Sequence, residues 1–304
     1  MSLEPRLVRI GTRGSALARW QADWIRSRLA VSNPGLRCAI VAFSTAGDRI
    51  LDRPLPEIGG KGLFTEELER ALLEGSIDLA VHSLKDLPVD SPPGLTLGAI
   101  AEREDPRDAL VSAKYRTLGD LPEGARVGTS SLRRSAQLLA VRPDIGLLPL
   151  RGNVDTRVKK ALDGEYDAIV LAAAGLTRLG RGAAIASYLA VEDMLPAPGQ
   201  GALAVQCRKD DEATLSLLAG LEHPATRSEV GAERAFLKAL GGGCSAPIAA
   251  LGLARGGIIR LEGLVASRDG SALVRVRATG GDPEELGRGL ADEALARGAG
   301  ELLE

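Results

Sequence analysis

Arginine, hydroxyl and glycine residues occur together at three points of the sequence, each directly after a short apolar run. The segments are GTRGS at residues 11–15, GTSSLRR at 128–134 and RGN at 151–153. A strand that ends in such a turn presents free backbone N–H groups, and arginine adds a two-pronged donor for carboxylate or phosphate. The pattern therefore predicts binding of several anionic groups. For any single turn a structural interpretation is equally good: Ser130 and Ser131 would cap a helix, with Arg133 and Arg134 on its solvated face.

A lysine and a carboxylate follow another apolar run, in VHSLKDLP at residues 81–88. Lys85 and Asp86 fall in a turn that Pro88 keeps from continuing as a helix. A carboxylate at the end of a buried strand can stabilise a developing cation or relay a proton. The competing interpretation is a turn aspartate paired with its neighbour. We expect His82, one residue inside the strand, to be a packed residue rather than a ligand.

Cys244 stands in the glycine-rich segment LGGGCSAP at residues 240–247. The glycines let the backbone move or approach a ligand closely, and the thiol lacks the apolar neighbours typical of a structural cysteine. Among the three cysteines, Cys244 is therefore the expected reactive one. Only two histidines occur, neither in a catalytic motif, which disfavours a Cys–His hydrolase. With no CxxC in the sequence, we also expect no metal site.

The elements that must position these residues alternate along most of the chain. Apolar runs of strand length lie at residues 8–10, 39–43, 79–81, 95–100, 126–128, 145–150 and 168–172, with helical spacing between several of them. This alternation predicts an α/β architecture with largely parallel sheets, in which ligands bind beyond the carboxyl ends of the strands. The last part differs, with helices near residues 227–240 and 283–297 and strands at 258–266 and 273–278. We interpret it as a separate α+β domain.

Composition excludes several functional classes. The chain has 304 residues, 38 Lys and Arg against 40 Asp and Glu, and 3% aromatic residues, so it offers neither a basic surface nor stacking platforms for nucleic acid. Since no apolar run reaches membrane-spanning length and no secretory signal is evident, we expect a cytoplasmic protein without a membrane partner. Neither a P-loop nor a GxGxxG after a strand occurs, which disfavours nucleotide binding.

Taken together, the motifs closely resemble the porphobilinogen deaminase family, also called hydroxymethylbilane synthases. The resemblance runs over nearly the whole chain, and eight blocks in order are specific where any one would be weak. The blocks are RIGTRGSALARWQ (9–21), IGGKGLF (58–64), VHSLKDLP (81–88), EREDPRDALV (102–111), VGTSSLRR (127–134), LRGNVDTR (150–157), LPAPGQGA (195–202) and GGGCSAP (241–247).

The resemblance implies a fold of two α/β lobes, similar to those of periplasmic binding proteins, with a central cleft and a smaller C-terminal α+β domain. The discontinuous domain 1 would comprise residues 1–100 and 195–219, domain 2 residues 101–194, and domain 3, which carries the cysteine, residues 220–304. A monomer is expected.

The resemblance also implies the chemistry. Cys244 would hold one covalent dipyrromethane cofactor per chain through a thioether. Four molecules of porphobilinogen would be added in turn with loss of ammonia, and water would then release hydroxymethylbilane, a tetrapyrrole precursor. Since each pyrrole carries an acetate and a propionate, scattered arginine turns suit such a product.

By motif position, Asp86 would be the catalytic residue, stabilising the cations that form as ammonia leaves and as the next pyrrole attacks. The expected cofactor-binding residues are Cys244, Lys85, Asp86, Thr129, Ser130, Ser131, Arg133, Arg134 and Arg151. The expected substrate-binding residues are Arg13, Ser15, Lys61, Arg157, Arg178 and Gln200.

Two alternatives remain beside this interpretation. A two-lobed anion-binding protein without catalysis would use the same arginine turns, but it would normally carry a secretory signal and would have no use for Cys244. A homologue without activity is the other, and retention of Asp86 and Cys244 argues against it. Departures from the family pattern, Arg19 and Gln206, fall outside the motif positions that carry chemistry.

Overall fold

The computed structural model describes residues 7–49, 64–243 and 246–303. The chain divides into two compact units. One comprises Met1–Ile50, Gly60–Arg103 and Ala202–Arg227, and the other comprises Leu51–Gly59, Glu104–Gly201 and Ser228–Glu304.

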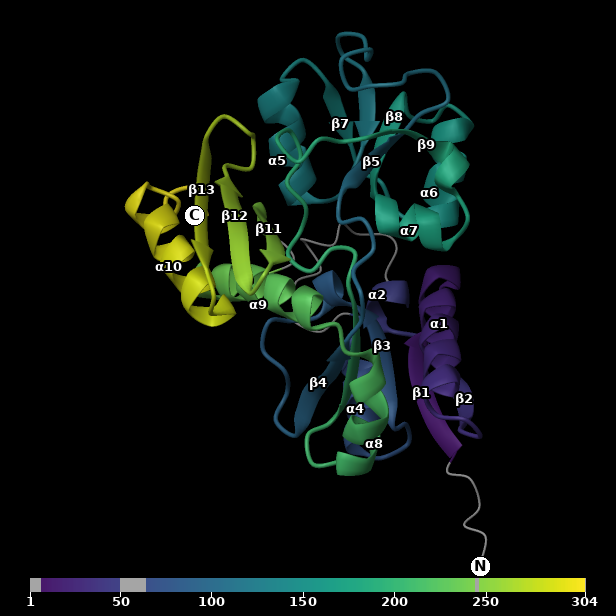
Figure 1. Ribbon diagram of the computed structural model, residues 1–304. Coiled ribbons are helices and arrows are strands. Elements are labelled where there is room, and N and C mark those ends of the chain that lie inside the picture. The colour runs from purple at the N-terminus through teal and green to yellow at the C-terminus, as the bar shows by residue number, and fades with distance from the viewer. Residues whose placement is uncertain (1–6, 50–63, 244–245, 304) are drawn as a thin grey trace, which may run out of the picture. The chain divides into compact units, whose positions relative to one another are not determined.

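The first unit is built on a sheet of five strands in the order β2-β1-β3-β10-β4 (Figure 1). Strand β1 runs parallel to β2 and β3, whereas β10 is antiparallel to both β3 and β4. The strands are β1 (Leu7–Arg13), β2 (Arg37–Phe43), β3 (Leu79–Ser83), β4 (Leu95–Ile100) and β10 (Leu203–Arg208).

Helices cover both faces of this sheet. On one face, α1 (Ala16–Ser32) and α8 (Glu212–Leu218) bury Ile25, Leu29 and Leu218 against the strands, and α4 (Glu66–Leu73) buries Leu68 and Leu72 on the other. The apolar positions of α1 recur at three- and four-residue steps, which is why one stripe of the helix is buried. Shorter elements complete the unit: α2 (Ala46–Arg49), η1 (Leu84–Asp86) and η3 (Ala219–Leu221).

The second unit contains a sheet in the order β7-β6-β8-β5-β9. Here β6 is parallel to β7 and β8, and β5 is antiparallel to β8 and β9. Helix α5 buries Leu138 on one face, and α6 and α7 bury Val158 and Leu176 on the other. The elements are β5 (Asp108–Val111), β6 (Arg126–Gly128), β7 (Gly146–Leu148), β8 (Ala168–Ala172), β9 (Ile185–Tyr188), α5 (Leu132–Val141), α6 (Val154–Leu162), α7 (Ala173–Arg178) and η2 (Gly182–Ala184).

The two five-stranded sheets share one order of strands and one pattern of directions, so the predicted pair of similar α/β lobes is confirmed. The expectation of largely parallel sheets needs a correction, because each sheet contains one reversed strand, β10 or β5. Each reversed strand comes directly after a strand of the other sheet along the chain: β5 follows β4, and β10 follows β9. Apolar periodicity reports burial and not direction, so the sequence could not reveal the reversal.

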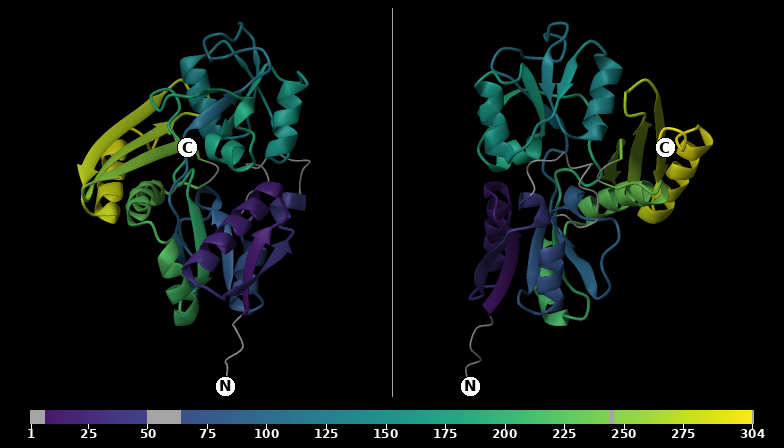
Figure 2. Two further views of the ribbon diagram at one scale, coloured as in Figure 1. Left: turned by 45° about the vertical axis from the view of Figure 1, so that its right-hand side comes forward. Right: turned by 180° about the vertical axis from the view of Figure 1, so that it is seen from behind.

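The C-terminal part of the second unit is a three-stranded antiparallel sheet with helices on one face (Figures 1 and 2). Its α+β character and its four predicted elements are confirmed. The elements are α9 (Pro224–Ala239), β11 (Ile248–Arg255), β12 (Ile258–Ala266), β13 (Leu273–Gly280) and α10 (Pro283–Ala296).

Both faces of this small sheet are packed. Phe236 of α9 and Leu290 of α10 are buried on one face, and Ala249 and Leu264 pack with Ala136 of α5 on the other. Among all the described residues, no helix combines the length and the apolar character that crossing a bilayer requires.

Candidate functional site

The turn that follows β6 is held by its own hydroxyl groups. Ser131 is the N-cap of α5, where its Oγ accepts the N–H of Arg134 at 3.5 Å. Ser130 Oγ donates to the Leu150 carbonyl at 3.0 Å and accepts the Leu150 N–H at 2.9 Å, which ties the ends of β6 and β7 together. Thr129 Oγ1 accepts the Ser131 N–H at 3.2 Å. The capping interpretation thus holds for Ser131, whereas Ser130 joins two turns.

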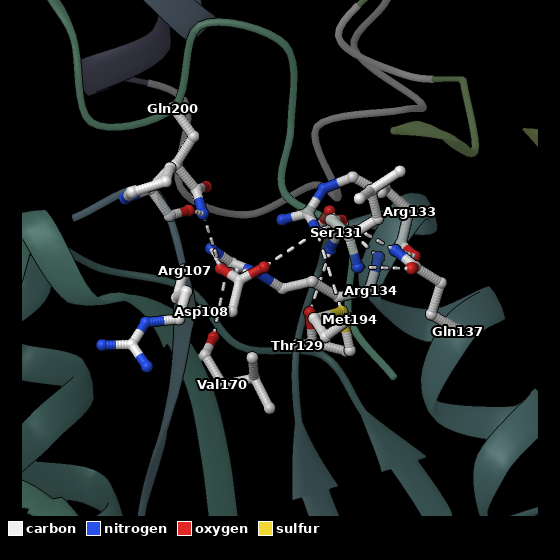
Figure 3. Close-up of polar contacts among 12 residues, drawn as sticks. Arg107, Asp108, Thr129, Ser131, Arg133, Arg134, Gln137, Val170, Met194 and Gln200 are labelled. Atoms are coloured by element: carbon white, nitrogen blue, oxygen red, sulfur yellow. Dashed lines mark hydrogen bonds and ion pairs between the residues drawn. The ribbon is translucent and has the colours of Figure 1, made fainter. Parts of the chain in front are cut away.

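Arg133 and Arg134, in the first turn of α5, are not on a solvated face; only 4% and 7% of their surface is exposed. Both bind the fully buried Asp108 at the start of β5 (Figure 3). Arg133 Nη1 lies 2.8 Å from Asp108 Oδ2, and Arg134 Nη2 lies 2.7 Å from Oδ1. Both also donate to backbone carbonyls, Arg133 to Leu195 O and Arg134 to Val170 O, and Arg133 Nη1 lies 3.6 Å from Met194 Sδ. Gln200 Nε2 donates to Asp108 Oδ1 at 3.1 Å.

We define the Asp108 cluster as Asp108, Arg133, Arg134 and Gln200. Its positive and negative charges do not cancel. Two guanidinium groups share one carboxylate, and among the described residues no second carboxylate forms an ion pair with either of them. Burial lowers the pKa of Arg133, while Asp108 acts in the opposite direction. Because a surplus buried cation is costly, an anionic group from a ligand would stabilise the cluster. The cluster is therefore suited to hold a carboxylate beside Asp108.

Three further arginines lie on the turns and helices of the second unit. Arg178, at the end of α7, is 9% exposed and donates to the Gly201 carbonyl at 2.6 Å. Burial lowers its pKa to about 10, against an opposing effect of Glu104. Arg157 Nε donates to Gly152 O at 2.7 Å, and Arg151 is partly buried at the start of the same turn. Arg151 thus lies in the turn that follows β7, whereas Arg157 and Arg178 lie on the helices α6 and α7.

In the first unit, the predicted residues lie at the ends of β1 and β3. Arg13 ends β1 and its guanidinium lies 4.2 Å from the centroid of the Phe64 ring. Ser15 is the N-cap of α1 and accepts the Ala18 N–H at 3.2 Å. Lys85 and Asp86 are partly buried in η1, which follows β3 directly. Among the described residues, the Asp86 carboxylate accepts no hydrogen bond and forms no ion pair, so it is available to a ligand.

Lys61 and Cys244 lie outside the described residues. Asp108 is the residue of the candidate site that sequence reasoning missed, although it stands in the block at residues 102–111. A single charged residue that opens an otherwise apolar strand, DALV, is the signal that points to a buried carboxylate with a cationic partner.

His82 of β3 is packed, as expected, with 5% of its surface exposed. Burial lowers its pKa from 6.5 to about 4, against a smaller opposing effect of Gln206. The unfolded chain therefore takes up a proton as the pH falls below about 6.5, whereas the folded protein resists protonation until about 4. The contribution of the neutral His82 to the free energy of unfolding is therefore complete above about pH 6.5, and it is lost as the pH falls from there to about 4.

We expect the free energy of unfolding in urea to fall by about 2 kcal/mol more between pH 7 and pH 5 in the parent than in His82→Gln. The paired comparison removes the effect of other titrating groups. Equal losses in the two proteins would contradict a neutral buried His82.

Comparison with known proteins extends these observations. Residues 8–216 match the family described as porphobilinogen deaminase, dipyromethane cofactor binding domain, and residues 228–296 match the porphobilinogen deaminase C-terminal domain. A protein named porphobilinogen deaminase from Pelobacter propionicus is 51% identical, with 99% of this chain and 98% of that protein covered. Another of that name, from Geobacter metallireducens, is 50% identical, with coverage of 99% and 95%.

Among solved structures, a periplasmic substrate-binding protein of an ABC transporter from Coxiella burnetii is similar with a TM-score of 0.46 and 16% identity, over 73% of this chain and 94% of that one. The matched domains take in both sheets of the lobes and the C-terminal sheet, and the identities extend over almost the full length of the relatives. The resemblance of the sequence blocks is thereby confirmed, and the chain belongs to the porphobilinogen deaminase family.

Proposed function

We propose that this protein condenses four molecules of porphobilinogen, with loss of ammonia, and releases hydroxymethylbilane by hydrolysis. The observation that carries the proposal is the Asp108 cluster, in which two buried guanidinium groups share one carboxylate. A surplus buried cation suits a product that brings an acetate and a propionate with every pyrrole. Membership of the porphobilinogen deaminase family supports the same reaction.

The residues of the second unit fit a resident dipyrromethane cofactor, because their surplus positive charge matches its side-chain carboxylates. We assign its attachment to Cys244 and its binding to Thr129, Ser130, Ser131, Arg133, Arg134 and Arg151, with Lys85 and Asp86. When bound, the cofactor supplies the nucleophilic pyrrole carbon from which the product grows. Arg133 and Arg134 would hold its carboxylates with the guanidinium N–H groups that do not bind Asp108 or backbone carbonyls.

Asp86 is the proposed catalytic residue. Its carboxylate has no hydrogen bond or ion pair among the described residues, so it can accept the N–H of an incoming pyrrole. As ammonia leaves porphobilinogen, positive charge develops on the pyrrole ring, and a nearby carboxylate stabilises it. The same carboxylate can take the proton that is lost after carbon–carbon bond formation.

The growing product needs further cationic and polar partners, and we assign these to Arg13, Ser15, Lys61, Arg157, Arg178 and Gln200. Arg13 and Ser15 follow β1, and Arg157 and Arg178 belong to helices that follow strands of the second sheet. These are the strand ends at which α/β folds bind ligands.

The domain division proposed for this function is residues 1–100 with 195–219, residues 101–194 and residues 220–304. We further propose that the protein acts as a monomer in the cytoplasm. Its proposed partners are porphobilinogen and water.

Intact mass tests the proposal directly. We expect the purified parent to exceed its sequence mass by two condensed porphobilinogen units, and Cys244→Ala to show the bare mass, because the thioether needs the thiol. Cys38→Ala is the matched control: Cys38 is a partly buried thiol whose pKa is raised by burial, so its loss should leave the excess in place.

A parent at the bare mass is then incubated with porphobilinogen. A subsequent gain of two units supports the proposal, since it marks an apo-enzyme that builds its own cofactor. No gain would favour an anion-binding protein without catalysis and would overturn the proposal.

A further inference from the structure

A buried segment, residues 195–201, lies between the Asp108 cluster and the C-terminal sheet. On the side of α5, Gln137 Oε1 accepts the Leu195 N–H at 2.7 Å, and Arg133 Nη1 donates to the Leu195 carbonyl at 2.7 Å. On the side of the C-terminal sheet, the Ala250 N–H donates to the Pro196 carbonyl at 3.1 Å. The segment 195–201 is therefore bonded to both neighbours.

Glu233 of α9 makes the most buried of these links. Its side chain is fully buried, and its two carboxylate oxygens accept from different backbone segments. Oε2 accepts the Gly199 N–H at 2.6 Å, and Oε1 accepts the Gly252 N–H of β11 at 2.8 Å. One carboxylate thus fixes the turn at Gly199 to α9 and to β11 at once. A hydrogen bond to a buried carboxylate is stronger than one between neutral groups, so this link is stiff.

The residue after Gly199 carries the connection into the cluster. Gln200 is fully buried, and its Nε2 donates to Asp108 Oδ1 at 3.1 Å and to the Pro106 carbonyl at 2.7 Å. Gly199 and Gly201 have φ values of +75° and +89°, so the backbone on both sides of Gln200 adopts a conformation that favours glycine. The turn therefore has one defined shape, which aims Gln200 at Asp108.

These contacts form one continuous path. It runs from Glu233 through the Gly199 N–H and the Gln200 side chain to Asp108, and from there to Arg133 and Arg134. Every side chain on the path is more than nine-tenths buried. Along the sequence, α9 ends at Ala239, shortly before the GGGCSAP block.

We propose that Glu233 is a positioning residue, which acts through the turn at Gly199 and Gln200 to hold Arg133 and Arg134 on Asp108. In consequence, α9 and the arginines of the Asp108 cluster are coupled. Only the consequence for the cofactor rests on the proposed function, because the coupling between Glu233 and the arginines needs no ligand. Loss of the carboxylate at Glu233 should weaken the hydrogen bond of Arg134 to Asp108, although Glu233 does not contact Arg134.

The test compares Glu233→Gln with Glu229→Gln in the full-length protein. The control is matched, because Glu229 lies on the same helix and accepts a backbone N–H of the same strand, from Ala254 at 3.0 Å, whereas the acceptor of the Gly199 N–H is Glu233. The readout is the exchange rate of the Nε–H of Arg134, which donates to Asp108 at 3.0 Å, followed in ¹H–¹⁵N spectra. We expect about tenfold faster exchange in Glu233→Gln and a change below about twofold in Glu229→Gln.

Unchanged exchange in Glu233→Gln, or equal acceleration in both variants, would overturn the proposal, since the second result would mark general destabilisation. If Glu233→Gln does not fold, Gln200→Leu reads the path in the opposite direction, because coupling is reciprocal. It should then raise the exchange rate of the Gly252 N–H, which bonds Glu233 and not Gln200. A Gly252 N–H that exchanges at the parental rate would overturn the proposal.

Incorporation of porphobilinogen provides the second readout. Followed by intact mass on cofactor-free protein, formation of the two-unit adduct should slow by about tenfold in Glu233→Gln and should keep the parental rate in Glu229→Gln. Parental incorporation in Glu233→Gln would contradict the predicted consequence. A parent that incorporates nothing would refute the proposed function instead, and the exchange of the Arg134 Nε–H, which needs no porphobilinogen, would still decide the coupling.

Discussion

Asp86→Asn is expected to lower the turnover of porphobilinogen by about 100-fold or more while the protein keeps its fold. Asparagine has the size of aspartate and retains a hydrogen-bond acceptor, so binding of a pyrrole N–H is largely preserved. Stabilisation of a cation is not, because the negative charge is gone. The loss should appear mainly in kcat, since the positive charge develops after binding.

This substitution should leave the stability of the fold almost unchanged, because the Asp86 carboxylate forms no ion pair or hydrogen bond among the described residues. No native partner loses its contact there, so the free energy of unfolding in urea should change by less than about 0.5 kcal/mol. Asp90→Asn serves as the matched control, since Asp90 is an exposed aspartate of the same segment. Near-normal turnover in Asp86→Asn would remove Asp86 from the mechanism.

The sequence predicts the architecture well because its signals are local. Apolar runs and helical spacing fall where β1, β3, β4, β6 and β8 and the helices of the C-terminal domain lie. What the sequence does not reveal is direction: β5 and β10, the strands at which the chain crosses from one sheet to the other, are reversed. Such pairing depends on residues far apart in the chain, about which a local pattern carries no information.

The candidate site shows the same division between local and long-range information. That Ser131 caps a helix follows from its place before an apolar run, and the structure confirms it. That Arg133 and Arg134 are buried does not follow, because the partner that makes their burial tolerable, Asp108, lies on a different strand. The family resemblance supplies the roles of Asp86 and Cys244, and these roles stay predictions until the variants are measured.

The free energies of unfolding of Asp108→Asn and Asp105→Asn should differ sharply. The two aspartates stand only three residues apart, and both pair with arginine. We expect Asp108→Asn to lower the free energy of unfolding in urea by about 3–5 kcal/mol, because it leaves the buried Arg133 and Arg134 without a counter-charge. Asp105 lies 2.6 Å from Arg107, but 25% of its side chain and 43% of the arginine's remain exposed. Since water screens that pair, Asp105→Asn should cost below about 1 kcal/mol.

The same comparison tests whether the Asp108 cluster receives an anion. In Asp108→Asn two buried guanidinium groups have lost their shared carboxylate, so the carboxylates of a bound cofactor should compensate more of the charge than they do in the parent. Raising the pH within the neutral range should not have this effect, because an arginine keeps its charge there. Cofactor loading should thus increase the free energy of unfolding of Asp108→Asn more than that of the parent or of Asp105→Asn. Equal increases in all three proteins would mean that the cofactor carboxylates bind away from Arg133 and Arg134.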